Sequence, residues 1–425
     1  MKLLGGTKIS FLDFLFVFCI IIYAASASKF VRGYGNLLYL STYIPLLFAI
    51  VLGVKHRIKI KNELFIAIGV FFAYFILASL VNGYLSGGFV SYWIITLIIS
   101  YVMINCFGKQ YFAAYETIVL YLTIIATAIW GVYLFIPDTV VSFCKQFQFS
   151  ESFTDELDAI NIIFYTHLDY AYGFVGDEIH TFPRNSGFAF EPGAFASMIC
   201  FAIACNVIRN NGLRIRNNFP FLVFMGALFT TESTTGGITF ILIIIFWLFA
   251  NRGSGRTYLY LIFLIPLGIW VFSQGFVGAK MFNELSYSRQ VSYTSGGDSG
   301  TGRFLSFLLY FQNFLDRPIF GNAGDPNTYL SRIGYQYSIH SGFGELLSDF
   351  GAIMTIVFFM LLARSVKMFK KFFGNSSVVL LAAIIGSMVS YSQWHYPAIF
   401  VFIIFDLFYS DDVMLDDTLP INNKP

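Results

Sequence analysis

Long apolar stretches alternate with short polar ones along the whole chain. Each apolar stretch has about 15 to 25 residues, which is the length a helix needs to cross the hydrocarbon core of a bilayer. The pattern predicts an all-α polytopic integral membrane protein with about 12 transmembrane helices. The predicted spans are Ile9 to Ala25, Leu37 to Val54, Leu64 to Val81, Phe89 to Phe107, Phe112 to Ile136, Pro192 to Ile208, Phe219 to Thr231, Ile238 to Ala250, Tyr258 to Gln274, Phe343 to Ala363, Val378 to Tyr391 and Pro397 to Tyr409.

Lysine and arginine are concentrated in the connections on one side of this predicted bundle. Four short loops share the basic character, at 55–61, 209–216, 251–256 and 364–371. Loops rich in Lys and Arg remain in the cytoplasm, so we expect both termini to be cytoplasmic. The periplasmic side then carries two long connections, 137–191 and 275–342, which should form the active face.

The first apolar stretch resembles a cleavable signal peptide, because Lys2 and Lys8 precede it and Ala25-Ser26-Ala27 follows it. We expect the helix to be retained. Its removal would leave an odd number of spans and place the basic loops on the wrong side of the membrane.

The composition limits the class of protein. Of 425 residues, 57% are hydrophobic and 12% are charged, whereas soluble domains have about 25% charged residues. No basic cluster resembles a nucleic-acid surface, and the cysteines lack metal-ligand spacing, so we expect no nucleic-acid partner, cofactor or metal. No repeat or linker divides the chain, which predicts a single membrane domain over residues 1–425.

The first long periplasmic connection is acidic. Asp155, Glu156 and Asp158 could together hold a divalent metal. Acidic outer loops are more commonly solvated surface, and this is the interpretation that we prefer.

Two pairs of predicted helices are short. Phe219 to Ala250 must turn within 231–237, and Val378 to Tyr409 must turn near 394–397. Irregular backbone at membrane depth is tolerated only where protein buries it or where it lines a wet cavity. Glu232 and His395 are therefore either cavity-lining residues or ordinary polar residues of the turns.

The segment before the sixth span has local features of a helix entry. Pro192 suits the first helical position, which places Glu191 at the N-cap. Gly187 and Gly193 permit close backbone approach and unusual dihedrals. Arg184 precedes Glu191 by seven residues. It either takes part in chemistry with Glu191 or pairs with it to pin the loop.

The first half of the stretch 299–351 predicts an amphipathic helix lying on the membrane surface, with apolar residues recurring at helical spacing from Phe304 to Leu315. Its polar positions are Ser306, Gln312, Asn313 and Asp316. Ser299 and Thr301 are candidate N-caps, so Arg303 falls in the first turn. Free backbone N–H groups and the helix dipole favour an anion there, and a phosphate would fit. Alternatively, Arg303 only extends its side chain towards lipid headgroups.

His340 stands at the start of the tenth span. Histidine titrates near neutrality and can act as a general base or as a partner for phosphate. A structural role at the membrane interface is the alternative. Arg184, Glu191, Arg303 and His340 are all predicted at helix starts on one face of the protein.

The sequence resembles bacterial O-antigen polymerases and the related O-antigen ligases at RNSGFAFEPGAFA, TGRFLSFLLYFQNFLDRPIFGNAG and HSGFGELLSDFGA. The shared pattern is an Arg followed by a Glu-Pro-Gly helix entry, an Arg-led interfacial helix closing in Pro-x-x-Gly-x-Gly, and a His before a late helix. Segment 318–324 departs from this pattern by one extra residue between its glycines.

The resemblance implies a membrane glycosyltransferase of the bacterial inner membrane that works without metal. It would transfer a glycan from undecaprenyl pyrophosphate to a sugar hydroxyl of another lipid-linked unit at the periplasmic face, with a chain-length regulator as a candidate partner beside the lipid bilayer. Arg303 and Arg184 would bind the pyrophosphate, and His340 would deprotonate or orient the acceptor hydroxyl. Glu191 would orient Arg184 or share the role of base.

Two alternatives to a polymerase remain, namely an O-antigen ligase and a polysaccharide transporter or flippase. Ion-coupled transporters keep ionisable groups near the middle of the membrane. Asp13, Glu116 and Asp406 instead fall near predicted helix ends, which favours the transferase.

Overall fold

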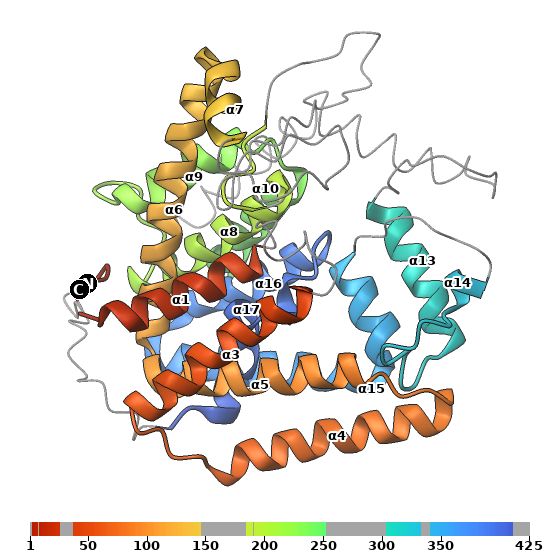
Figure 1. The fold of residues 1–425 in the computed structure, drawn as a ribbon. Coiled ribbons are helices and arrows are strands. Elements are labelled where there is room, and N and C mark those ends of the chain that lie inside the picture. Colours follow the sequence, from red (N-terminus) through yellow and green to blue (C-terminus); the bar gives the residue numbers. More distant parts are fainter. Residues whose placement is uncertain are drawn as a thin grey trace, which may run out of the picture.

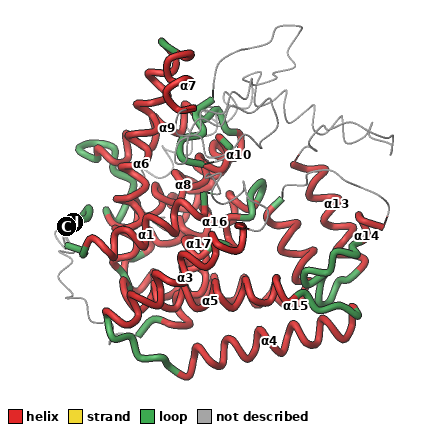
Figure 2. The backbone as a smooth tube through the Cα atoms, in the orientation of Figure 1, coloured by secondary structure: helices red, strands yellow, loops and turns green. Residues whose placement is uncertain are grey.

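The computed structural model describes residues 2–6, 8–25, 37–145, 184–189, 191–251, 303–332 and 341–410. Within these ranges the elements are helical, apart from an isolated bridge between Lys2 and Lys8 (Figures 1 and 2). The α-helices are α1 (Phe11–Ala24), α3 (Leu37–Lys55), α4 (Asn62–Asn82), α5 (Gly87–Phe107), α6 (Gln110–Phe135), α7 (Pro137–Lys145), α8 (Pro192–Arg209), α9 (Phe219–Thr230), α10 (Thr234–Ala250), α13 (Arg303–Asp316), α14 (Tyr329–Arg332), α15 (Gly342–Phe373), α16 (Val379–Met388) and α17 (Pro397–Phe408). Two 3₁₀ turns, η1 (Asn375–Val378) and η2 (Gln393–His395), flank α16.

Several of these helices can span a membrane. Among the described residues, α4, α5, α6, α8 and α15 are long and apolar enough to cross a bilayer, and the remaining apolar helices are shorter. The predicted span Tyr258 to Gln274 lies outside the described residues. The described residues confirm an all-helical architecture that is consistent with a membrane protein, and the total of twelve spans stays a prediction.

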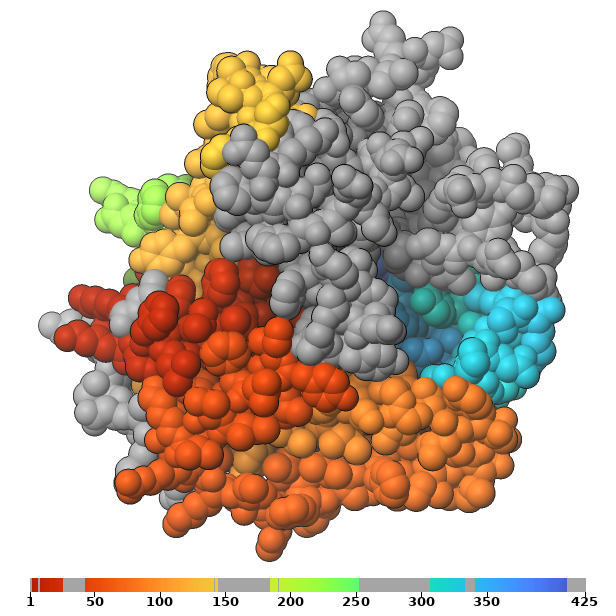
Figure 3. All heavy atoms as spheres, in the orientation of Figure 1, coloured from red at the N-terminus to blue at the C-terminus, as the bar shows by residue number. Residues whose placement is uncertain are grey.

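Helix α8 lies at the centre of the bundle, in contact with α6, α9, α10 and α16 (Figure 1). Small side chains along α8 let these neighbours approach closely. They include Ala194, Ala196, Ser197, Ala202 and Ala204, all of them buried. The outer helix α4, along the lower edge of Figure 3, instead exposes large apolar side chains such as Phe65, Val70 and Leu80, which a bilayer would cover.

The two predicted short helix pairs are confirmed. Helices α9 and α17 have 12 residues each and α16 has 10. A helix of 12 residues is about 18 Å long, whereas the hydrocarbon core is about 30 Å thick. The connections 231–233 and 389–396 therefore begin within the thickness of the bundle.

Helix α15 is kinked at Gly351, whose backbone adopts φ 61 and ψ −170. The segment 318–324 that follows α13 lies against this kink. Three backbone hydrogen bonds of 2.8 Å join the two segments, from Asn322 N to Ser348 O, from Ala323 N to Asp349 O and from Ala352 N to Pro318 O. These bonds replace helical ones, and this explains why the kink is stable.

Segment 318–324 has one residue more between its glycines than the pattern that it resembles, and its backbone is left-handed at three positions. Gly321, Ala323 and Gly324 have φ values of 61, 49 and 79. A Cβ at Gly321 would lie 2.5 Å from the backbone nitrogen of Gly351. The two segments can approach this closely only because residues 321 and 351 are both glycine.

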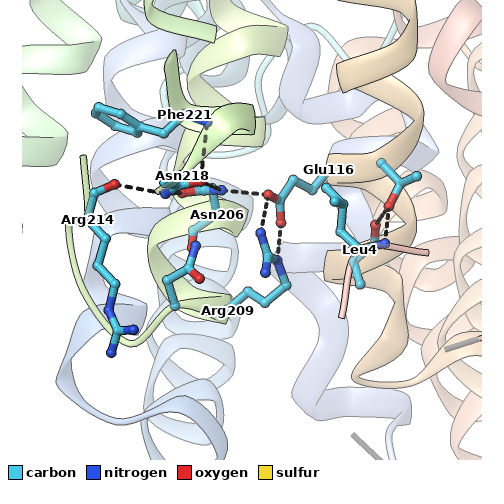
Figure 4. A network of polar contacts seen from close by, with 10 residues as sticks. Leu4, Glu116, Asn206, Arg209, Arg214, Asn218 and Phe221 are labelled. Carbon is cyan, nitrogen blue, oxygen red and sulfur yellow. Dashed lines mark hydrogen bonds and ion pairs between the residues drawn. The ribbon is translucent and has the colours of Figure 1, made fainter. Parts of the chain in front are cut away.

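One end of the bundle, here named the basic end, holds carboxylates paired with basic residues. The pairs are Asp13 with Lys55 and His56 (2.8 Å each), Glu116 with Arg209 (2.7 Å) and Asp406 with Arg364 (2.8 Å). Leu4 N donates to Thr117 Oγ1, beside Glu116, which joins the N-terminal segment to the same end (Figure 4). The three carboxylates therefore lie near helix ends, as predicted.

Candidate functional site

The opposite end of the bundle, here named the site end, carries segments 184–191, 231–234, 341–345 and 389–396. Helix α8 begins here and ends at the basic end with Arg209. The first residues of α8 and α15 both contact the connection between α16 and α17. Tyr391 Oη donates to Glu191 Oε2 (2.8 Å), and Trp394 Nε1 donates to the Gly342 carbonyl (3.0 Å).

Glu191 has the predicted N-cap position of α8. Its backbone is extended (φ −131, ψ 150), and Pro192 follows within the first turn. The Glu191 side chain does not cap the helix. It accepts the Tyr391 hydroxyl instead, so the structure ties the start of α8 to a residue 200 positions further along the chain.

The two glycines of this segment are required by contact, as predicted from the sequence. Gly187 has φ 54, and a Cβ on it would lie 2.6 Å from the Phe195 ring. A Cβ on Gly193 would overlap the Tyr391 hydroxyl. A side chain at position 187 or 193 is therefore excluded, because Phe195 and Tyr391 approach the two glycines closely.

Arg184 fixes its loop to the turn between α9 and α10. Its Nε donates to the Thr231 carbonyl (3.0 Å) and its Nη2 to the Glu232 carbonyl (3.1 Å). The next residue, Asn185, donates its backbone N–H to Thr230 O (2.9 Å). These contacts satisfy carbonyls at the end of α9. Arg184 thus holds its loop in place through the backbone carbonyls of Thr231 and Glu232. Its contact with pyrophosphate stays a prediction.

Helix α13 begins at Arg303, so Arg303 lies in the first turn as predicted, while the candidate N-caps Ser299 and Thr301 lie outside the described residues. The polar residues of α13 are arranged differently from expectation. Ser306 and Asn313 are 0% and 4% exposed, and α13 packs on α15. Leu308 and Leu315 are exposed instead. The sequence predicted polar positions facing water, whereas Ser306 and Asn313 face protein, because α13 packs on α15 and α14 and Asn313 Oδ1 accepts from Leu330 N of α14 (3.1 Å). The Arg303 side chain is outside the described atoms.

His340 lies outside the described residues. The residue after it, Ser341, is the N-cap of α15, and its hydroxyl accepts from Gly344 N (3.2 Å). Ser341 is buried next to the connection between α16 and α17. A Cβ on Gly342 would collide with the Tyr391 carbonyl, so the start of α15 is packed tightly.

A carboxylate and an imidazole that the sequence did not pair meet at this end. Glu345 Oε1 lies 3.6 Å from His395 Nδ1, and the Ser392 hydroxyl donates to Glu345 Oε2. The two ionisable side chains are 25% and 20% exposed. Sequence patterns describe neighbours within one helix, and these residues are 50 positions apart, so no local signal could pair them.

Tyr310 of α13 covers the first turn of α15. A Cβ on Gly344 would lie 2.8 Å from Tyr310 Cβ. Burial raises the pKa of Tyr310 above its ordinary value, and the negative charges of Glu345 and Asp349 raise it further. Tyr310 therefore lies close to both carboxylates as a neutral phenol.

Aromatic rings surround His395. The ring centroids of Tyr396, Trp394 and Tyr92 lie 4.3, 5.7 and 5.8 Å from that of the imidazole. Tyr92 Oη also donates to the His395 carbonyl (3.2 Å). The imidazole is thus held between residues of α5 and of the connection between α16 and α17.

Metal binding is not indicated in the part of the chain that the structure describes, where no three His, Cys, Asp or Glu side chains form a group that could hold an ion. The acidic residues Asp155, Glu156 and Asp158 lie outside that part. The described residues of the site end interact through hydrogen bonds and through the Glu345–His395 contact.

Comparison with known proteins finds no matching family model, no matching curated protein and no matching solved structure.

Proposed function

We propose that this chain is a membrane glycosyltransferase of the O-antigen polymerase type. It moves a glycan from undecaprenyl pyrophosphate to a sugar hydroxyl of another lipid-linked unit. The observation that supports this most is the difference between the two ends of the bundle. Carboxylates at the basic end are matched with cations, whereas the site end gathers helix starts, Arg184 and a partly exposed carboxylate–imidazole pair.

Helix starts suit the anionic part of such a donor. Helices α8, α10 and α15 all begin at the site end, and helix N-termini present N–H groups and positive dipole ends to anions. Breaking the anomeric bond leaves charge on the departing pyrophosphate. Fixed donors and an Arg303 guanidinium would stabilise that charge without metal.

The depth of the site suits a lipid-linked substrate. The short helices α9, α16 and α17 place the connections 231–233 and 389–396 within the thickness of the bundle. The pyrophosphate of a polyprenyl lipid lies at the membrane interface while its tail remains in the hydrocarbon. A recessed polar site therefore meets the reacting atoms without removing the lipid from the bilayer.

Charge supports the orientation. The basic end carries the loops 55–61 and 209–216 and the last turns of α15, residues 364–371, which were expected to form a loop. The positive-inside rule assigns these basic segments to the cytoplasm. The site end then faces the periplasm of the bacterial inner membrane. A ligase would use the same chemistry. Gels of surface polysaccharide from cells lacking the protein separate the two, with single repeats expected for a polymerase and loss of all attached repeats for a ligase.

The decisive variant is Arg303→Lys. A guanidinium makes two parallel hydrogen bonds to phosphate, whereas an ammonium acts as a point charge. Losing this contact should cost about 3 kcal/mol of transition-state stabilisation, or about a hundredfold in rate. The measurement is polymer length and yield at matched protein level.

The matched control is Arg332→Lys at the same end, since Arg332 is 42% exposed and bonds Asp316 at the surface. Its polymer should resemble that of wild type. Equal polymer from Arg303→Lys would mean that Arg303 only anchors the protein to headgroups, and the pyrophosphate site would have to lie elsewhere.

A further inference from the structure

Two residues of the connection between α16 and α17, Ser392 and His395, face the Glu345 carboxylate at the start of α15. The backbone N–H of Glu345 donates to Ser341 O (2.9 Å), which fixes its position in the first turn. Ser392 donates to Oε2, and His395 Nδ1 lies 3.6 Å from Oε1. The carboxylate faces Nδ1 at an ion-pair distance, longer than a hydrogen bond, and leaves the other ring nitrogen, Nε2, on the side away from Glu345.

The balance of charge differs from that at the basic end. Asp13 there pairs with both His56 and Lys55, so a permanent cation neutralises it. No Lys or Arg among the described residues forms an ion pair with Glu345. A carboxylate that faces the His395 imidazole stabilises a positive charge on it, as a general base requires once it has accepted a proton.

The pair is also accessible. Glu116 at the basic end is fully buried, whereas the Glu345 and His395 side chains are 25% and 20% exposed. The rings of Tyr92, Trp394 and Tyr396 form a wall around the imidazole. Trp394 is buried and supports the wall from behind, whereas Tyr92 and Tyr396 are partly exposed. Aromatic faces pack well against the C–H faces of sugar rings, so these two tyrosines suit a glycan acceptor.

We propose that His395 is the general base for the acceptor hydroxyl and that Glu345 is the residue that positions it; this inference rests on the proposed glycosyltransferase function. In the step, the acceptor O–H bond breaks and its proton moves to His395 Nε2. The acceptor oxygen forms a bond to the anomeric carbon of the donor glycan. The bond from that carbon to the pyrophosphate oxygen breaks, and the electron pair leaves with the pyrophosphate. The proton then passes from His395 to water.

This assignment competes directly with His340, to which the sequence resemblance gives the same role. Both residues belong to the site end by sequence, since His340 immediately precedes the N-cap Ser341. Comparing the two histidines in one assay separates the assignments. His56, on the basic end and bonded to Asp13, supplies a control of the same residue type.

The experiment uses the full-length protein in vesicles with a polyprenyl-pyrophosphate-linked oligosaccharide as both donor and acceptor. The turnover number kcat and the KM are measured for wild type, His395→Gln, His340→Gln and His56→Gln, after thermal melting has shown that each variant is folded. Loss of a general base lowers kcat by about a hundredfold or more. We expect this for His395→Gln with KM within twofold of wild type, and near-normal kcat for His56→Gln.

Glu345 provides a second, independent measurement. Glu345→Gln keeps an oxygen that accepts from Ser392 but removes the charge, so kcat should fall about tenfold or more at unchanged KM. Glu345→Asp, which restores the carboxylate, should recover part of kcat. If Glu345 had only a structural role, Glu345→Gln would lower the melting temperature, and restoring the charge in Glu345→Asp would not recover kcat. If His395→Gln does not fold, this pair of variants decides the question.

The outcomes are separable. If wild type transfers glycan and folded His395→Gln keeps kcat within threefold, the inference is overturned and the proposed function stands. Equal kcat in Glu345→Gln and wild type also overturns it. If the wild-type protein transfers no glycan under conditions where the donor binds, the proposed function and the inference both fall.

Discussion

The buried ion pair between Glu116 and Arg209 gives the sharpest test of the structure (Figure 4). Glu116 is 0% exposed, and its carboxylate accepts from Arg209 Nε (2.7 Å), from Arg209 Nη2 (2.8 Å) and from Asn206 Nδ2 (2.7 Å). Arg209→Met removes two charge-assisted bonds and leaves a buried carboxylate without a cation. Breaking a buried pair in this way destabilises a protein by about 3–5 kcal/mol.

A second ion pair, with nearly the same distance between its nitrogen and oxygen atoms, provides the control. Arg364 lies 2.8 Å from Asp406, but its side chain is 61% exposed. Exposed pairs contribute about 0–1 kcal/mol, so Arg364→Met should be nearly neutral. The contrast therefore depends on burial and not on distance.

The assay is reversible unfolding of the purified protein in mixed micelles, followed by circular dichroism for both variants. The double variant Glu116→Gln/Arg209→Met removes the charge but keeps an acceptor for Asn206. It should recover most of the stability lost in Arg209→Met, which gives a coupling energy for the pair. If Arg209→Met costs no more than Arg364→Met, Glu116 is not buried as described and the packing of α6 on α8 is wrong.

Two further predictions concern the kink and the orientation. Gly351→Ala should abolish monodisperse protein in size-exclusion chromatography, because the φ of 61 is strained for alanine and a Cβ would collide with the Ile319 carbonyl; Gly69→Ala in α4, where nothing lies within 4 Å, should behave as wild type. A cysteine introduced at Asn327 should react with a membrane-impermeant thiol reagent in intact spheroplasts and one at Asn211 should not, while labelling at Asn211 alone would reverse the orientation.

Features that depend on local chain chemistry could be predicted from the sequence. Apolar length predicted the long helices α4, α5, α6, α8 and α15, and two unusually short runs predicted the pairs around α9 and α16. Proline at a first helical position placed Glu191 at the start of α8, and Arg303 lies in the first turn of α13 as expected. These features follow from backbone geometry and hydrophobic length, which neighbouring residues in the sequence encode.

Only the tertiary structure decided which distant residues meet. In the structure Tyr391 donates a hydrogen bond to Glu191, Arg184 donates to the carbonyls of the α9–α10 turn, and Glu345 lies beside His395. The tertiary structure also buries two polar residues of α13, Ser306 and Asn313, and kinks α15 at Gly351 against segment 318–324. Such pairings depend on how whole helices pack, because a side chain's partner is set by the contact surface between elements and not by the spacing of residues within one element.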